Sequence, residues 1–200
     1  MKPQRPTSDP QTTPSVRIIG GHLRGRKLLY SGDPRTRPMK DRVRESVFNL
    51  IGHQVENRHA IDLFAGTGAL GFEALSRGAA RATFVEQHFP TAAIIEQNIA
   101  ALDLADVCQV AKSNTFIWAK RHPDLGELPW LVFSSPPYAF YSDRADDMLE
   151  LLTGLLERAP AESVMVVEAD ERFDFALLPQ AEGWEVRAYP PARIAIRHAS

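Results

Sequence analysis

Short apolar runs alternate with helical patterns from residue 60 to the C-terminus, and this alternation limits the possible folds more than any other feature of the 200-residue chain. The expected strands are 60–66, 81–87, 106–112, 130–135, 163–169, 184–190 and 193–199. The expected helices between them are 69–77, 90–102, 115–121 and 143–158. Apolar strands separated by helices are typical of βαβ units around a parallel sheet that is covered on both faces. We therefore predict an α/β fold with a seven-stranded, mostly parallel sheet and an antiparallel hairpin at one edge.

The chain before residue 60 has a different texture. Residues 16–30 alternate apolar and basic side chains about Gly20-Gly21, which predicts a small β-hairpin. Residues 39–52 have the apolar spacing of a helix that ends at Gly52. We expect a disordered tail over 1–15, a basic hairpin and loop over 16–38, and the α/β domain over 39–200.

Charge is distributed unevenly, although the formal net charge is only −2. Residues 16–44 contain nine Lys and Arg against two acids, whereas residues 45–200 contain twelve against twenty-two. A basic segment on an acidic body favours a polyanionic partner, and nucleic acid is a better interpretation than a solvated surface. The candidate phosphate contacts are Arg17, Arg24, Arg26, Arg37, Lys40 and Arg44.

Composition excludes several other classes. No apolar run approaches the ~20 residues that cross a bilayer, and the proline-rich N-terminus is not a secretory signal, so we expect a cytoplasmic protein. The single cysteine, Cys108, excludes an intrachain disulfide. No histidine has metal-ligand spacing to another His, Cys or acid, and we expect no metal.

The stretch DLFAGTGALG (62–71) joins the first expected strand of the α/β region to its first helix. Gly66, Gly68 and Gly71 satisfy G-x-G-x-x-G, which lets a ligand approach the backbone at a helix N-terminus. Glu86 ends the next strand, where a carboxylate can accept hydrogen bonds from ribose hydroxyls. Together they predict a nucleoside-cofactor site; the alternative is that the glycines only permit tight packing of helix against strand.

Asn114 and Thr115 follow the third strand of this region, beside the expected position of an adenine ring. Their polar groups could contact the edge of that ring, and the same residues are ordinary N-cap sequence for the next helix. The two interpretations are compatible.

Ser135-Pro136-Pro137-Tyr138 follows the strand that ends at about residue 135, at the mouth of the same crevice. Two prolines fix the backbone, so the Pro136 carbonyl and a neighbouring side-chain oxygen can accept both hydrogens of an exocyclic amine. Oxygens held in this way favour a pyramidal nitrogen and stabilise the positive charge that develops as it attacks a sulfonium methyl group. Tyr138 would stack on the base. The stretch therefore predicts an amine clamp.

These motifs resemble the amino-directed S-adenosylmethionine-dependent methyltransferases. Residues 17–28, 37–49 and 68–79 are more specifically similar to the RsmD-type small-subunit (16S) ribosomal RNA guanine-N2 methyltransferases. The resemblance implies a Rossmann-like class I fold, methylation of the 2-amino group of a guanine, and a monomer acting on small-subunit ribosomal RNA or an assembling 30S particle. It implies cofactor contacts by Asp62, Phe64, Ala65, Gly66, Thr67, Gly68, Glu86, Asn114 and Thr115.

One position departs from that family, which usually has Asp where this chain has Ser135. A serine has no charge and a shorter reach, so a lower rate is expected, and Ser135→Asp is expected to raise it. Three alternatives stay open: an adenine-amino nucleic-acid methyltransferase, an NAD-dependent oxidoreductase, and a non-catalytic RNA-binding or assembly protein on the same fold.

Overall fold

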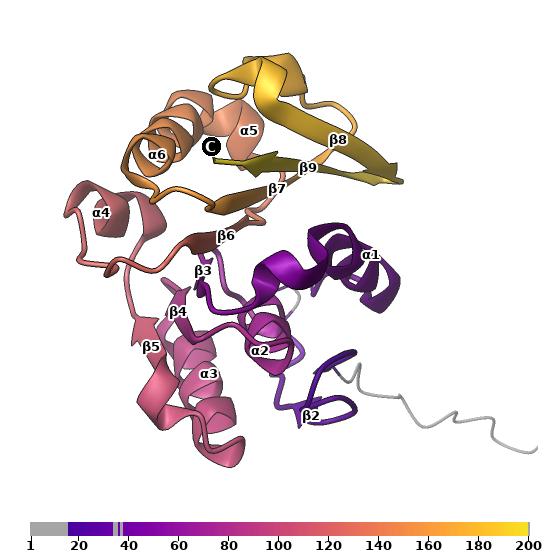
Figure 1. The fold of residues 1–200 in the computed structure, drawn as a ribbon, viewed down its shortest axis with the longest axis vertical. Coiled ribbons are helices and arrows are strands. Elements are labelled where there is room, and N and C mark those ends of the chain that lie inside the picture. Colours follow the sequence, from indigo (N-terminus) through magenta and orange to yellow (C-terminus); the bar gives the residue numbers. More distant parts are fainter. Residues whose placement is uncertain (1–15, 34–35, 37, 200) are drawn as a thin grey trace, which may run out of the picture.

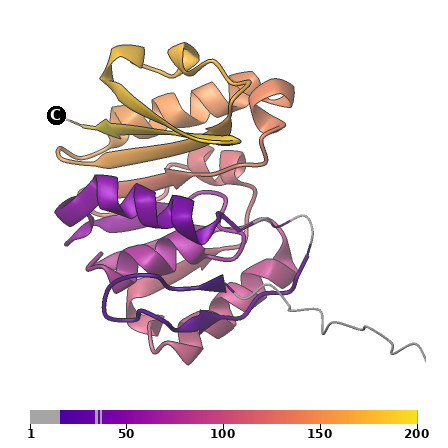
Figure 2. The same cartoon turned by 90° about the vertical axis from the view of Figure 1, so that its right-hand side faces the viewer.

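A computed structural model describes residues 16–33, 36 and 38–199. The expected tail over 1–15 and the candidate phosphate contact Arg37 lie outside the described residues. The fold consists of a two-stranded sheet and a seven-stranded sheet, and helices cover both faces of the larger sheet (Figures 1 and 2).

The seven-stranded sheet has the order β5-β4-β3-β6-β7-β9-β8. Its strands are β3 (His59–Asp62), β4 (Arg81–Val85), β5 (Cys108–Ala111), β6 (Trp130–Ser134), β7 (Val164–Asp170), β8 (Trp184–Tyr189) and β9 (Ala192–His198). Strands β3 to β7 pair in parallel, whereas β9 lies antiparallel between β7 and β8. The predicted mostly parallel sheet with a terminal antiparallel hairpin is confirmed.

Helices form a layer on each face of this sheet (Figures 1 and 2). One layer contains α1 (Asp41–Ile51), α2 (Ala69–Ser76) and α3 (Phe89–Ala101), and the other contains α4 (Thr115–Lys120), α5 (Phe140–Asp143) and α6 (Ala145–Arg158). Single turns of 3-10 helix occur at Gly52–Val55, Ala105–Val107, Phe175–Leu177 and Ala181–Gly183.

Alternation along the strands explains why they are apolar throughout. Leu131 and Phe133 of β6 pack in the core beneath α1 and α2, whereas Val132 between them packs in the core beneath α4 and α6. Successive side chains of a strand point to opposite faces, so a strand with helices on both sides needs apolar residues at every position.

The N-terminal hairpin consists of β1 (Val16–Arg17) and β2 (Lys27–Leu28), with Val16 opposite Leu28. The predicted hairpin is present, but Gly20-Gly21 does not form a tight turn at its centre. A Cβ on Gly21 would lie 1.7 Å from the Ser76 carbonyl oxygen, so this glycine allows the loop to press against the end of α2. Val16 and Leu28 belong to the core beneath α1 and α2, and the expected boundary at residue 38 does not separate two cores.

Within the described part of the chain, none of the helices combines the length and apolar character needed to traverse a lipid bilayer.

Candidate active site

The site lies at the carboxyl ends of the parallel strands. Strand β3 pairs with β4 on one side and with β6 on the other, so the connections leaving β3 and β6 run to opposite faces of the sheet. Ligands of open α/β sheets bind at such a reversal, outside the carboxyl ends of the strands. The loop 63–68, the residues after β4 and the stretch 135–138 all lie at this edge.

The glycines of the loop after β3 have two separate functions. Gly66 and Gly68 have φ angles of +51° and +74°, the left-handed region that favours glycine, and they shape the loop that leads into α2. Gly71 has an ordinary φ angle, but a Cβ there would lie 2.4 Å from Cε1 of Phe84. The packing interpretation therefore accounts for Gly71 and also applies to the buried Gly68, where a Cβ would lie 2.8 Å from Cε2 of Phe72, so the close approach of a ligand rests on Gly66.

Asp62, at the end of β3, is 1% exposed. Its Oδ2 accepts a hydrogen bond of 3.3 Å from the Gly71 amide. Burial raises the pKa of Asp62 to about 7, and the neighbouring Glu86 charge also raises it. A cationic ligand in the loop would favour the charged form of this carboxyl, so Asp62 fits a positively charged cofactor.

Glu86 follows β4 and turns its carboxylate toward the glycine loop. Its Oε2 accepts from the Gly66 amide at 2.9 Å, and its Oε1 accepts from the His88 amide at 2.7 Å. Each carboxylate oxygen keeps a further lone pair, so Glu86 can still accept from a ribose hydroxyl. Glu86 thus lies beside the glycine loop, where the sequence pattern predicted it. The ribose contact itself stays a prediction.

Asn114 and Thr115 contact the protein itself. The Asn114 side chain caps α4 by accepting from the Phe116 and Ile117 amides at 3.1 and 3.3 Å. The Thr115 hydroxyl is buried and donates to the Leu63 carbonyl. The Thr115 contact attaches the start of α4 to the loop after β3. Contact with adenine stays a prediction for both residues.

The other predicted cofactor residues lie in the same loop with different exposure. Ala65 and Thr67 are buried, whereas Phe64 is half-buried. The Phe64 ring makes edge contacts with Phe116 and Phe140, each with ring centroids 6.0 Å apart. This aromatic cluster joins the glycine loop to α5, the short helix that follows Tyr138.

The stretch 135–138 continues directly from β6 and faces Glu168 of β7. The Ser135 hydroxyl donates to Oε2 of Glu168, and the Tyr138 hydroxyl donates to Oε1 at 2.8 Å. Among the described residues, no N–H or O–H group donates to the Pro136 carbonyl. Ser135 Oγ therefore keeps lone pairs for a further donor, and the carbonyl of the buried Pro136 is left as an acceptor among the described residues.

Glu168 was not identified from the sequence. Ser134 pairs with Val167 in the parallel register, so the next residues, Ser135 and Glu168, become neighbours. The available signal was a charged residue inside the expected buried strand 163–169. A carboxylate on a core strand is rare unless it is paired or functional.

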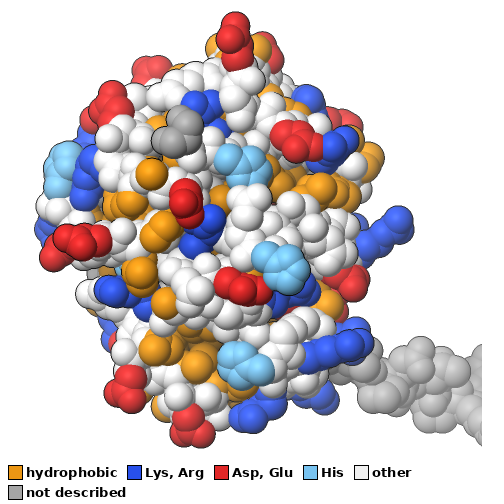
Figure 3. Space-filling view, in the orientation of Figure 1, with side chains coloured by type: hydrophobic (Ala, Val, Ile, Leu, Met, Phe, Trp, Pro, Cys, Tyr) orange, Lys and Arg blue, Asp and Glu red, His pale blue; other side chains and the backbone are white. Residues whose placement is uncertain are grey.

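Four of the predicted phosphate contacts are exposed: Arg17, Arg24, Arg26 and Lys40. Arg17 forms an exposed ion pair with Asp41 at 3.2 Å, and Arg26 donates to the Ala101 carbonyl at 3.0 Å. Figure 3 shows Lys and Arg side chains gathered around the place where β2 lies in Figure 1.

The prediction for Arg44 as a phosphate contact is wrong. Arg44 is 0% exposed, and its guanidinium donates to the carbonyls of Met39 and Arg17 at 3.1 and 2.6 Å. It also pairs with Asp41, and its Nε lies 3.8 Å from Glu73. Burial lowers the pKa of Arg44, which the neighbouring Asp41 and Glu73 charges oppose. Arg44 is a structural residue, since no polyanion can reach it.

Glu73 of α2 is the centre of this buried cluster and is also 0% exposed. It accepts from the amides of Ile19 and Gly20 at 2.7 and 2.8 Å and from Arg77 Nε at 2.7 Å. Helix α2 therefore begins at the glycine loop and holds the basic hairpin through Glu73 and through its last residue, Ser76.

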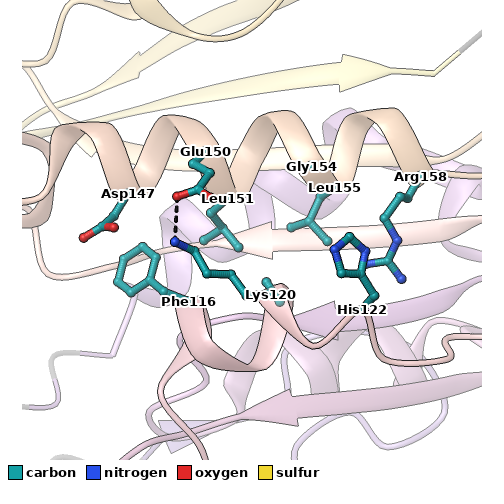
Figure 4. A pocket seen from close by; sticks show the side chains of 10 residues that line it. Phe116, Lys120, His122, Asp147, Glu150, Leu151, Gly154, Leu155 and Arg158 are labelled. Atoms are coloured by element: carbon teal, nitrogen blue, oxygen red, sulfur yellow. Dashed lines mark ion pairs between the residues drawn. The ribbon is translucent and has the colours of Figure 1, made fainter.

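A separate cavity of about 180 Å³ lies between α4 and α6 (Figure 4). Lys120 and Glu150 form an ion pair of 2.8 Å across its mouth. The cavity is on the opposite face of the sheet from Glu168 and Ser135, and it contains none of the predicted site residues. Among the described residues there is also no group of three His, Cys, Asp or Glu side chains that could hold a metal.

Comparison with known proteins identifies relatives over most of the chain. The family model described as "Conserved hypothetical protein 95" matches residues 16–189. Ribosomal RNA small subunit methyltransferase D of Escherichia coli strain K12 is 41% identical over 125 residues, which cover 62% of this chain and 60% of the relative. The chain thus aligns with about three fifths of that relative's length.

Solved structures extend the similarity in fold. The Escherichia coli protein yhhF, provisionally described as a methyltransferase, has a TM-score of 0.76 and 28% identity, covering 94% of this chain and 99% of its own. The Thermus thermophilus 16S rRNA N2 G1207 methyltransferase RsmC, solved with AdoMet and guanosine, has a TM-score of 0.69. It is 18% identical and covers 93% of this chain and 50% of its own, so it shows the fold alone.

Proposed function

Because the chain belongs to the family of conserved hypothetical protein 95, the RsmD-type methyltransferases, we propose that it transfers a methyl group from S-adenosylmethionine to the 2-amino group of a guanine in small-subunit ribosomal RNA. One observation carries the proposal: Ser135, whose hydroxyl oxygen keeps lone pairs for an amine, and Pro136 follow β6 at the same sheet edge as the glycine loop between Asp62 and α2. A donor of methyl groups and an amine can therefore meet at this edge.

The loop residues would hold the cofactor. S-adenosylmethionine supplies an electrophilic methyl group and brings two positive charges. Gly66 would allow a ligand to approach the loop backbone closely, and Asp62 and Glu86 would give the site negative charge. Thr115 holds the start of α4 against the loop and Asn114 caps that helix, beside the expected adenine.

The clamp residues would hold the acceptor base. Ser135 and Pro136 each accept one hydrogen of the amine, which orients the nitrogen lone pair toward the methyl group. The ring of Tyr138 is fixed by its hydroxyl contact to Glu168 and would stack on the base. A base in duplex or folded RNA reaches this position only after extrusion from the stack.

The exposed basic residues of the hairpin would bind the phosphates of the RNA, and the base would then be placed by the clamp. We propose that the enzyme works as a monomer in the cytoplasm on ribosomal RNA or on an assembling 30S particle.

The decisive experiment is single-turnover transfer of labelled methyl groups to small-subunit RNA and to 30S particles, followed by mass spectrometry of the nucleosides. We expect N2-methylguanosine. N6-methyladenosine would assign the adenine alternative, NADH binding without S-adenosylmethionine binding would favour an oxidoreductase, and RNA binding without any transfer would leave a non-catalytic protein.

Glu86→Gln should weaken cofactor binding. The substitution removes the charge, and it places an amide where the carboxylate now accepts from Gly66 and His88. We expect a loss of about 1–3 kcal/mol in binding free energy, measured by calorimetry with S-adenosylmethionine. Glu96→Gln on the exposed side of α3 is the matched control and should bind normally. An unchanged affinity for Glu86→Gln would remove Glu86 from the cofactor site.

Replacing both Arg24 and Arg26 with alanine should weaken RNA binding and reduce its salt dependence. Each lost phosphate contact should lower the slope of log K against log salt by about 0.7–0.9. Cofactor affinity should not change, since both side chains are on the hairpin. Arg121→Ala, exposed after α4 on the other layer, is the control. A wild-type slope in the double variant would leave these arginines as ordinary solvated surface.

A further inference from the structure

Glu168 is a buried carboxylate whose hydrogen bonds are supplied by the predicted clamp. It is 7% exposed and accepts from Ser135 and Tyr138. Within the described part of the chain, no Lys, Arg or His side chain forms an ion pair with it. A buried charge without a cation is costly unless the site meets a positive charge at some stage.

The geometry sets the direction of the proton on Ser135. Because the hydroxyl hydrogen points to Glu168, the lone pairs of Ser135 Oγ remain available to the amine. Burial raises the pKa of the neighbouring Tyr141, and the Glu168 charge adds to this rise, so Tyr141 remains a neutral phenol beside Glu168.

We propose that Glu168 supplies the carboxylate that this chain lacks at residue 135, and that it acts through Ser135 as the proton acceptor of methyl transfer. This inference rests on the proposed function. When the amine nitrogen bonds to the methyl carbon, the carbon–sulfur bond breaks and its electron pair stays on sulfur, so the nitrogen must lose one proton. That proton passes to Ser135 Oγ while the hydroxyl proton of Ser135 passes to Oε2 of Glu168. Glu168 ends neutral and later releases its proton to water.

Glu168 also reverses the expectation for Ser135→Asp. A carboxylate at residue 135 would lie against the carboxylate of Glu168, and two such charges in contact cannot both remain ionised without cost. Ser135→Asp should therefore be less active than the wild type, and its melting temperature should fall by about 4 °C. Removing the second charge in Ser135→Asp/Glu168→Gln should restore the melting temperature and make the double variant more active than either single variant.

The test compares wild type, Glu168→Gln, Ser135→Asp and the double variant in single-turnover methylation, with calorimetry of cofactor and RNA binding. Glu168→Gln should lower the rate by about 10²-fold at saturating RNA while both affinities stay unchanged. Glu171→Gln, exposed just after β7, is the matched control and should behave as wild type.

Each outcome decides a separate point. A wild type that transfers no methyl group to any RNA overturns the proposed function and this inference together. An active wild type with an equally active Glu168→Gln variant overturns only the proton transfer through Ser135 to Glu168. If Glu168→Gln is slow and Ser135→Asp/Glu168→Gln is folded but inactive, Glu168 has a purely structural part. That result also overturns the proton transfer to Glu168.

Discussion

Glu73→Leu should lower the free energy of unfolding by about 3–5 kcal/mol, the range for breaking a buried charge cluster by removing one partner. The substitution leaves the amides of Ile19 and Gly20 without their acceptor and leaves Arg44 buried without a nearby Glu73 charge. The Arg44 guanidinium cannot turn to water in exchange, because Arg44 and Glu73 are both 0% exposed. Urea unfolding monitored by circular dichroism measures the change.

The control for this prediction is Glu45→Leu on the exposed side of α1, which should change stability by at most about 0.5 kcal/mol. Arg44→Met should also destabilise the protein, yet it should leave the salt dependence of RNA binding unchanged because Arg44 has no exposed surface. If Glu73→Leu unfolds like the wild type, the hairpin is not held by this cluster.

Ser135→Ala should lower the single-turnover rate of methyl transfer by about 10²–10³-fold, as for the loss of one preorganised polar partner. The alanine removes the acceptor for one amine hydrogen and also the connection to Glu168. Cofactor affinity should be unchanged, because among the described residues no hydrogen bond joins Ser135 to the glycine loop or to Glu86.

The two losses should not add. Because Ser135 and Glu168 form one hydrogen-bonded unit, the double variant Ser135→Ala/Glu168→Gln should be about as slow as Ser135→Ala alone. Equal rates for Ser135→Ala and wild type would show that the clamp is elsewhere. Pro137, exposed and without a side-chain donor or acceptor, offers a control: Pro137→Ala should have a smaller effect than Ser135→Ala.

Local pattern was enough to predict the architecture and which segments meet at the carboxyl ends of the parallel strands. The spacing of apolar residues in a strand or helix depends on which of its faces must be buried. Each segment therefore shows its own type of secondary structure without reference to the others. The glycine loop, Glu86 and the stretch 135–138 each follow a strand, so their common edge followed from the topology of parallel sheets.

Tertiary structure decided which charges are buried and which residues meet across the sheet. Arg44 and Arg24 lie in the same basic segment, and nothing in the sequence separates them. The hairpin folds over α2 and buries Arg44 near Glu73. Gly71 matches a ligand motif, yet Phe84 from the neighbouring strand explains it. Glu168 is 33 residues from Ser135 and becomes its partner only through the register of β6 with β7. Local pattern determines the elements, whereas burial and long-range contact depend on how those elements pack.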